Sequence, residues 1–179
     1  YPVIVKPSNL GSSIGISKAK DRKTLDDALN IAMQYDSKII IEKAIENLRE
    51  INCSVLGYQD NLEVSLCEEP LVGESILTFD DKYIRANTKG TNTGRKIPAP
   101  ISDELRVKIE EMAKECFMAI DGSGCARVDF LLENDDLLYA NEINTIPGSI
   151  AFYLWQPKGK EFTELIDDIL QIAFKVYEE

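Results

Sequence analysis

The most informative stretch of the sequence is CARVDFLLENDDLLYANEIN, residues 125–144. Two runs rich in apolar residues, 125–132 and 137–144, flank four polar residues, a pattern typical of a β-hairpin. We place the centre of the turn at Asn134 and Asp135. The register of the whole hairpin follows from that choice, because each residue counted outward on one strand fixes its partner on the other.

In this register the charged side chains gather on one face of the hairpin. Arg127 lies directly opposite Glu142, and strand alternation puts four polar residues on the same side: Arg127, Asp129, Glu142 and Asn144. Asp129 and Glu142 become diagonal neighbours about 7–8 Å apart at the backbone. Two carboxylates and an amide oxygen suit Mg²⁺ or Mn²⁺, and Arg127 adds a positive fork for a phosphate or an oxyanion. The alternative is a solvated sheet face with an ordinary Arg–Glu cross-strand pair.

The second informative stretch is KPSNLGSSIG, residues 6–15. A short apolar run delivers Lys6 into a loop of glycine and serine, residue types that let backbone N–H groups approach a polyphosphate. The order of residues differs from both the Walker loop and the dinucleotide-binding glycine pattern. Taken alone, the loop is equally compatible with a plain turn.

The rest of the chain predicts an α+β fold. Apolar residues recur at helical spacing in three segments: 22–36, 103–120 and 162–177. Thr24 and Asp27 fit a capping box in the first of them. Short apolar runs predict strands at 2–6, 38–42, 50–58 and 62–67. The span 68–100 lacks periodicity and is interpreted as a functional loop. We place a lobe boundary near residue 45, giving a smaller lobe, 1–45, and a larger lobe, 46–179.

Composition excludes several classes of function. Lys and Arg total 20 against 31 Asp and Glu, a net charge of −11, so the field repels nucleic acid and anionic lipid. Histidine is absent, which removes His-based triads and His-ligated zinc. The four cysteines have no zinc-site spacing and are interpreted as buried free thiols. Without a membrane span or a signal-peptide pattern, we expect a cytoplasmic protein.

Four blocks, in order and spacing, resemble the D-alanine–D-alanine ligase branch of the ATP-grasp enzymes: PVIVKPS (2–8), GSSIG (11–15), ARVDF (126–130) and NEINTIPG (141–148). The resemblance covers nearly the whole chain. It implies an ATP-grasp fold of two lobes with a nucleotide bound between them. It also implies that ATP phosphorylates a substrate carboxylate and that an amine then attacks the acyl phosphate.

The resemblance implies roles for individual residues. Lys6 would contact the ATP phosphates, and the loop around Ser12 and Ser13 would close over them. The remaining nucleotide contacts would come from Glu42, Lys43, Ile45, Glu50 and Asn141. The pair Lys82-Tyr83 resembles the family's mobile loop, in which the lysine reaches the γ-phosphate; a solvated lysine beside a partly buried tyrosine is the alternative.

The same resemblance assigns the reaction centre. Two Mg²⁺ ions, or Mn²⁺, would be ligated by Asp129, Glu142 and Asn144, and Arg127 would stabilise the transferring phosphoryl group. Ser12, Lys82 and Tyr83 would assist catalysis.

Substrate contacts would come from Gly148, Tyr153 and Leu154. The family usually carries a serine followed by leucine there to hold the carboxylate of the second substrate, and Tyr153 stands at the serine position. D-Alanine is the expected substrate. A ligase for another amino or hydroxy acid and a noncatalytic nucleotide-binding module are the alternatives. The chain is interpreted as a fragment lacking an N-terminal domain, from a protein expected to be a homodimer.

Overall fold

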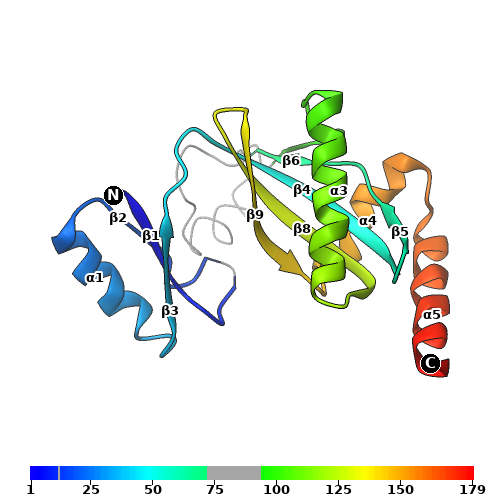
Figure 1. Cartoon of the computed structure of the whole chain (residues 1–179), viewed down its shortest axis with the longest axis horizontal. Coiled ribbons are helices and arrows are strands. Elements are labelled where there is room, and N and C mark those ends of the chain that lie inside the picture. Colours follow the sequence, from blue (N-terminus) through cyan, green and yellow to red (C-terminus); the bar gives the residue numbers. More distant parts are fainter. Residues whose placement is uncertain (12, 72–93) are drawn as a thin grey trace. The chain divides into compact units, whose positions relative to one another are not determined.

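The computed structural model describes residues 1–11, 13–71 and 94–179, and Figure 1 shows their helices and strands. Among the described residues, 1–46 belong to one compact unit, while 47–71 and 94–179 belong to a second. Each unit contains an antiparallel sheet with a helix packed on one face. The α+β class predicted from the sequence is therefore confirmed.

The first unit contains a three-stranded sheet in the order β2-β1-β3. Its elements are β1 (Val3–Pro7), β2 (Ser17–Ala19), α1 (Arg22–Ala32) and β3 (Ile39–Lys43). Val5 on β1 is buried with Ala28 and Ala32 of α1. Because strand side chains alternate, Lys6 projects to the face away from α1.

Helix α1 begins one turn earlier than the predicted capping box implied. Asp21 is the N-cap residue, its side chain accepts from the Thr24 backbone N–H, and the Thr24 hydroxyl accepts from the Asp21 backbone N–H. The box formed by Thr24 and Asp27 was therefore wrong. Aspartate and threonine both cap helices well, so the residue types alone did not decide between the two starts.

The second unit contains a four-stranded antiparallel sheet in the order β5-β4-β8-β9. Its strands are β4 (Leu48–Tyr58), β5 (Asn61–Val64), β8 (Ser123–Glu133) and β9 (Leu137–Asn144), with a separate short pair, β6 (Glu69–Pro70) and β7 (Arg95–Lys96). The helical elements are α3 (Asp103–Ala119), the 3₁₀ turns η2 (Gly148–Ala151) and η3 (Gln156–Lys158), α4 (Phe152–Trp155) and α5 (Phe162–Glu178). No described helix combines the length and the apolar composition needed to cross a bilayer.

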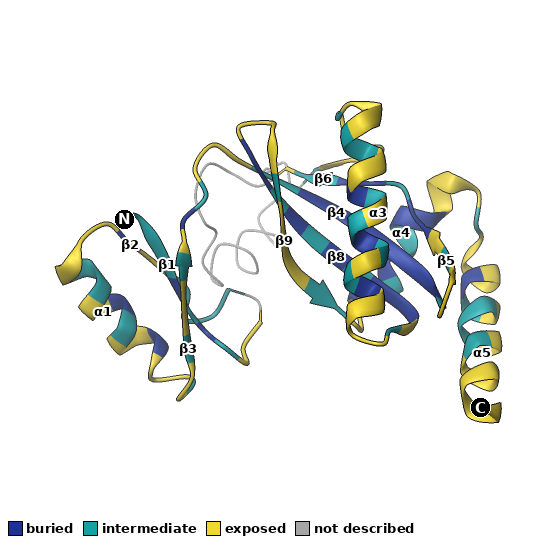
Figure 2. Cartoon of the chain, viewed as in Figure 1, coloured by how far each residue is buried: buried dark blue, intermediate teal, exposed yellow. Residues whose placement is uncertain are grey.

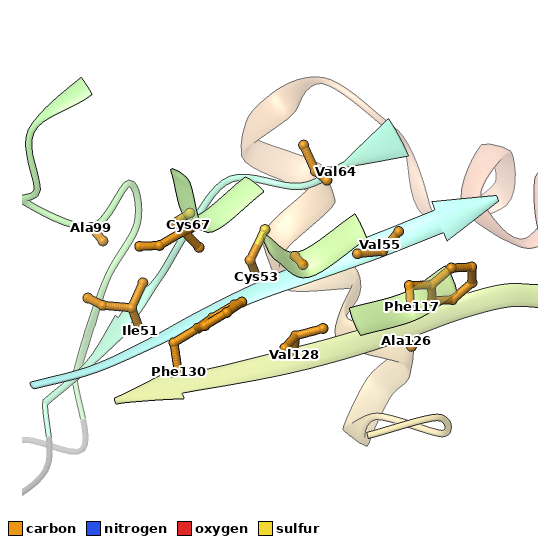
Figure 3. Close-up of a cluster of buried hydrophobic side chains, with 12 residues drawn as sticks. Ile51, Cys53, Val55, Val64, Cys67, Ala99, Phe117, Ala126, Val128 and Phe130 are labelled. Atoms are coloured by element: carbon orange, nitrogen blue, oxygen red, sulfur yellow. The ribbon is translucent and has the colours of Figure 1, made fainter. Parts of the chain in front are cut away.

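Alternation along the two central strands divides the sheet into two different faces. Ile51, Cys53 and Val55 of β4 join Val128 and Phe130 of β8 in a buried cluster beneath α3 (Figure 3). The opposite face is apolar only in part, where Leu56, Cys125, Trp155 and Leu165 form a smaller cluster with α4 and α5. Figure 2 shows the buried central strands between more exposed outer elements. The remainder of that second face is polar.

The four cysteines are free thiols, as predicted. Cys53, Cys67 and Cys125 are buried, but Cys116 is partly exposed, so its predicted burial was wrong. Hydrogen bonding with Cys67 and burial raise the pKa of the Cys53 thiol, and burial raises the pKa of the Cys125 thiol. Since only the thiolate reacts readily, we expect a thiol reagent at neutral pH to label Cys116 before the other three, which should react only after denaturation. Peptide mass mapping checks the order, and rapid labelling of native Cys53 would contradict it.

Candidate active site

The polar face of the second unit depends on the register of the β8–β9 hairpin. Glu133 pairs with Leu137 across a three-residue turn in which Asn134 and Asp135 have positive φ. Farther from the turn the register shifts once more, between the 129 and 130 positions of β8. The predicted register was therefore wrong for two reasons. The turn has three residues instead of two, and β9 contains one residue more than the part of β8 that it pairs with.

An irregularity at Asn141 explains how β9 places one side chain in the core and its neighbour on the polar face. Phe130 pairs with Ala140 and Asp129 with Glu142, so Asn141 is the additional residue of a β-bulge. Leu138 and Ile143, five positions apart, both pack against the core beneath α3. A regular strand would put them on opposite faces, so the bulge returns Ile143 to the core and turns Glu142 to the polar side.

The consequence is that Arg127 pairs with Asn144, and Asp129 pairs directly with Glu142. Arg127 donates Nε–H and Nη2–H to the two oxygens of Asp129, both at 2.6 Å. Asn144 Nδ2 donates to Asp129 Oδ2 at 3.0 Å and to Glu142 Oε1 at 3.4 Å. The prediction that these four side chains share one face is confirmed, although Asp129 and Glu142 are direct rather than diagonal neighbours.

Burial sets the electrostatics of this face. The Asp129 side chain is only 16% exposed, and its burial raises its pKa against the opposing effect of Arg127, with the charges of Glu142 and Glu68 adding to the increase. The hydrogen bonds from Arg127 to Asp129 raise the pKa of the guanidinium, which stays charged. A cation near these carboxylates would favour their charged forms.

The donor set fits a hard divalent cation. Asp129 and Glu142 supply carboxylate oxygens, and Asn144 already lies between them, so its side chain needs only to present oxygen instead of nitrogen. Within the described ranges, no group of three or more His, Cys, Asp or Glu side chains is arranged to hold a metal. The predicted metal site consequently depends on two carboxylates and one amide, and its occupancy stays a prediction.

Sequence reasoning missed Glu68, which lies at the edge of this face. Its backbone pairs with Asn52, and its carboxylate accepts from Asn52 Nδ2 at 3.0 Å and from the Tyr153 hydroxyl at 2.8 Å. Arg127 Nη1 donates to the same hydroxyl at 3.4 Å. Glu68 is 3% exposed. Its position at the start of an aperiodic span gave no local signal of this burial.

A left-handed turn carries the chain from β9 to Tyr153. Ser149, Ile150 and Ala151 have φ values of 52°, 53° and 51°, a conformation that non-glycine residues seldom adopt in succession. Gly148 is exposed at the start of η2, whereas Leu154 is fully buried. Of the predicted substrate residues, Leu154 can therefore offer a ligand only its main chain, while Tyr153 reaches the polar face.

In the first unit, the structure brings two of the predicted nucleotide residues together. Lys6 Nζ donates to Glu42 Oε1 at 2.7 Å. Ile4 is the cross-strand partner of Glu42, and Lys6 lies two positions after Ile4 on the same strand. The side chains of Lys6 and Glu42 therefore both lie on the sheet face away from α1. Lys43 pairs with Val3 and belongs to the opposite face.

The remaining predicted residues are distributed over several elements. Ile45 follows β3, Ser13 lies in the loop after β1 with φ of 60°, and Glu50 is a half-buried residue of β4. The predicted residues Ser12, Lys82 and Tyr83 lie outside the described residues.

The two antiparallel sheets, together with the acidic face that contains the half-buried Arg127, define a protein of the ATP-grasp class, as the sequence predicts. The family described as D-ala D-ala ligase C-terminus matches residues 1–171. The chain therefore belongs to the family of D-alanine–D-alanine ligase C-terminal regions.

Individual relatives agree with this membership. The D-alanine–D-alanine ligase of Thermosipho africanus is 41% identical over 179 residues, which are 100% of this chain and 48% of the relative. Two solved structures are similar: the D-alanine-D-alanine ligase from Coxiella burnetii (TM-score 0.81, 26% identity, 98% of this chain and 46% of that chain) and the VanG D-Ala:D-Ser ligase from Enterococcus faecalis (TM-score 0.80, 30% identity, 96% and 49%). The chain thus spans about half the length of the curated relatives it matches.

Proposed function

We propose that the complete protein carrying this chain is a cytoplasmic ATP-dependent ligase that joins two D-alanine molecules for peptidoglycan precursor synthesis. The observation that carries the proposal is the single sheet face on which Arg127 holds Asp129 through two hydrogen bonds while Asn144 joins Asp129 to Glu142. Family membership supports the same reaction. The predicted lobes, 1–45 and 46–179, and a homodimeric assembly are parts of this proposal.

The proposed reaction needs no nucleophile from the protein. A carboxylate oxygen of the first D-alanine attacks the γ-phosphorus of ATP, and the bond to ADP breaks. The amine of the second D-alanine then attacks the acyl carbon, loses a proton, and phosphate leaves with the original carboxylate oxygen. The protein contributes position and charge. Arg127, fixed at 2.6 Å from Asp129, supplies positive charge where the transferring phosphoryl group and the tetrahedral oxyanion develop negative charge.

We assign the nucleotide contacts to the residues that the family resemblance implies. Lys6 would bind phosphate oxygens and Glu42, Lys43 and Ile45 the base, while Ser12, Ser13, Glu50, Lys82 and Asn141 complete the set. The Lys6–Glu42 ion pair supports this assignment because it holds an amine and a carboxylate together on the sheet face opposite α1. Two Mg²⁺ ions, or Mn²⁺, held by Asp129, Glu142 and Asn144 would neutralise the phosphate charge when bound.

A second candidate is a ligase with a different acceptor. The substrate position that the family fills with serine holds Tyr153, and its hydroxyl is hydrogen-bonded to Glu68 and Arg127. One similar structure is a D-Ala:D-Ser ligase. The acceptor can therefore differ from D-alanine while the phosphoryl transfer stays the same.

The test is ATP-dependent phosphate release by the complete protein with D-alanine and a panel of other D- and L-amino and hydroxy acids, with products identified by mass. We expect D-alanyl-D-alanine. If another acceptor alone gives product, the second candidate replaces the first. Binding of ATP without release of phosphate with any pair would contradict both and favour a noncatalytic module.

The metal assignment gives a separate prediction. Changing Glu142→Gln keeps the shape of the side chain but removes a proposed ligand charge. Replacing residues that merely support metal ligands costs about 10- to 100-fold in affinity, so we expect the Mn²⁺ dissociation constant of the complete protein, measured by electron paramagnetic resonance, to rise at least about tenfold. Asp136→Asn, in the exposed turn of the same hairpin, is the control and should leave it unchanged. An unaltered constant in Glu142→Gln would remove Glu142 from the site.

A further inference from the structure

The Tyr153 hydroxyl already forms hydrogen bonds with other side chains of the protein. It donates its only proton to Glu68 Oε1 at 2.8 Å and can accept from Arg127 Nη1 at 3.4 Å. A substrate carboxylate accepts hydrogen bonds but cannot donate them. With its proton on Glu68, this hydroxyl therefore cannot serve as the donor that the family's serine offers to the second substrate.

The environment of Tyr153 also opposes a second negative charge. Glu68 is almost completely buried, and its Oε1 accepts from both Asn52 and Tyr153. A substrate carboxylate placed beside Glu68 would be repelled unless a cation lay between or next to them. The recognition of such a carboxylate thus requires positive charge at this edge of the face.

Arg95 supplies that charge in a fixed position. Its guanidinium carbon lies 4.0 Å from the centroid of the Tyr153 ring, and its Nη1 is 3.5 Å from Glu68 Oε2. Stacking on an aromatic ring and an ion pair at one end restrict a side chain that is otherwise flexible. The side chain remains 49% exposed, and a guanidinium has five N–H donors. The exposed part of the guanidinium can therefore donate to a ligand while the side chain stays on the Tyr153 ring.

We infer that Arg95 binds the carboxylate of the second substrate and that Tyr153 and Glu68 position it for this role. The inference rests on the proposed function and names the acceptor class: an amino or hydroxy acid with a free carboxylate. Tyr153 links Arg95 to Arg127, since its ring lies under one guanidinium and its hydroxyl accepts from the other. The carboxylate would be anchored one side chain away from the residue assigned to the developing oxyanion.

The experiment is an internal competition in the complete protein. ATP and D-alanine are supplied together with D-alaninamide, whose amine can accept the acyl group but whose neutral amide cannot form the ion pair. If the substrate panel identifies another acceptor, that acceptor and its amide are used instead. The mass ratio of the two products gives the ratio of the two kcat/KM values. This ratio does not depend on how much of a variant is folded.

For the unaltered protein we expect the acid to be preferred by about 10- to 100-fold, the range of a hydrogen bond to a charged group. In Arg95→Gln the preference should fall by that factor, with the KM for ATP unchanged. Lys96→Gln removes the neighbouring exposed charge and should keep the preference. Tyr153→Phe leaves the ring beneath Arg95 and should also keep most of it.

Three results would overturn the inference and leave the proposed function intact. An Arg95→Gln variant that keeps the full preference for the acid excludes Arg95 as the anchor, and the ligase function stands. A preference lost in Tyr153→Phe but kept in Arg95→Gln assigns the carboxylate to the hydroxyl. A raised KM for ATP in Arg95→Gln with an unchanged preference assigns the guanidinium to phosphate. Absence of any ligation by the unaltered protein contradicts the proposed function itself, and the inference with it.

Discussion

Replacement of Arg127 by alanine is expected to lower kcat of the complete protein by about 10²- to 10³-fold, the effect of removing one fixed donor from a developing negative charge. The guanidinium bonds both oxygens of Asp129 and also reaches Tyr153. Its loss leaves Asp129 beside Glu142 and Glu68 with no cation in that position, so the site becomes more negative where phosphate must approach. Steady-state kinetics with saturating ATP and Mg²⁺ measure the change.

A matched control separates catalysis from the loss of an ion pair. Arg106 on α3 donates to Glu110 at 2.7 Å, and Arg106→Ala should leave kcat within about twofold, because exposed helix pairs contribute little. Arg127→Lys keeps the charge but not the two-pronged geometry and should recover only part of the rate. A kcat of Arg127→Ala within threefold of the unaltered value would show that Arg127 has a structural role alone.

Replacement of Trp155 by alanine is expected to destabilise the second unit by about 3–5 kcal/mol, the range for truncating a buried aromatic side chain. Trp155 is fully buried among Leu56, Cys125 and Leu165, so it joins α4 and α5 to the sheet. Its Nε1–H donates to Ser54 Oγ at 3.2 Å. Alanine would leave a cavity and remove this buried hydrogen bond.

Urea unfolding followed by far-ultraviolet circular dichroism measures the loss, since the chain contains one tryptophan and fluorescence is lost with it. Phe174→Ala removes a large aromatic side chain from α5 that is 62% exposed, and it should change stability by no more than about 0.5 kcal/mol. A Trp155→Ala loss below about 1 kcal/mol would mean that α4 and α5 are held to the sheet by other contacts.

Local patterns predicted most of the elements because their periods are strong. The apolar stripe of α3 includes Ile109, Ala113 and Phe117, which are buried as a set, and such helical spacing is visible in the sequence alone. Helix α1 ended earlier than its pattern suggested, at Ala32, and Met33 is exposed. The helical spacing of apolar residues continued past the end of the helix, and the helix propensities of the residues after Ala32 gave no clear signal for its end.

The hairpin register could not be predicted from the turn residues. Two neighbouring residues, Asn134 and Asp135, suit a two-residue turn, yet Glu133 pairs with Leu137. The five-residue spacing of Leu138 and Ile143 did contain the signal, because an odd spacing between two core residues of one strand requires a bulge. The four polar residues still fell on one face because the added turn residue and the bulge together shift the partner by two positions.

The tertiary part of the site had no counterpart in local sequence. Glu68 and Tyr153 are separated by 85 positions and meet through one hydrogen bond, and Arg95 joins them from a strand of two residues. Neither the spacing of apolar residues nor the residue types of the turns indicate that these three side chains are in contact. The sequence showed that tyrosine replaces the family's serine at position 153. It did not show that the Tyr153 hydroxyl donates to Glu68, and that hydrogen bond determines what the hydroxyl can still bind.

The most direct test of the proposed acyl-phosphate reaction follows an oxygen atom. The complete protein is incubated with ATP, Mg²⁺ and D-alanine labelled with ¹⁸O in both carboxylate oxygens, and the phosphate and dipeptide are analysed by mass. We expect phosphate that gains one ¹⁸O per dipeptide formed, because the attacked γ-phosphorus keeps the donor oxygen when the amine displaces the phosphate. Dipeptide formed with unlabelled phosphate, or phosphate released from ATP without labelled oxygen and without dipeptide, would contradict an acyl-phosphate reaction.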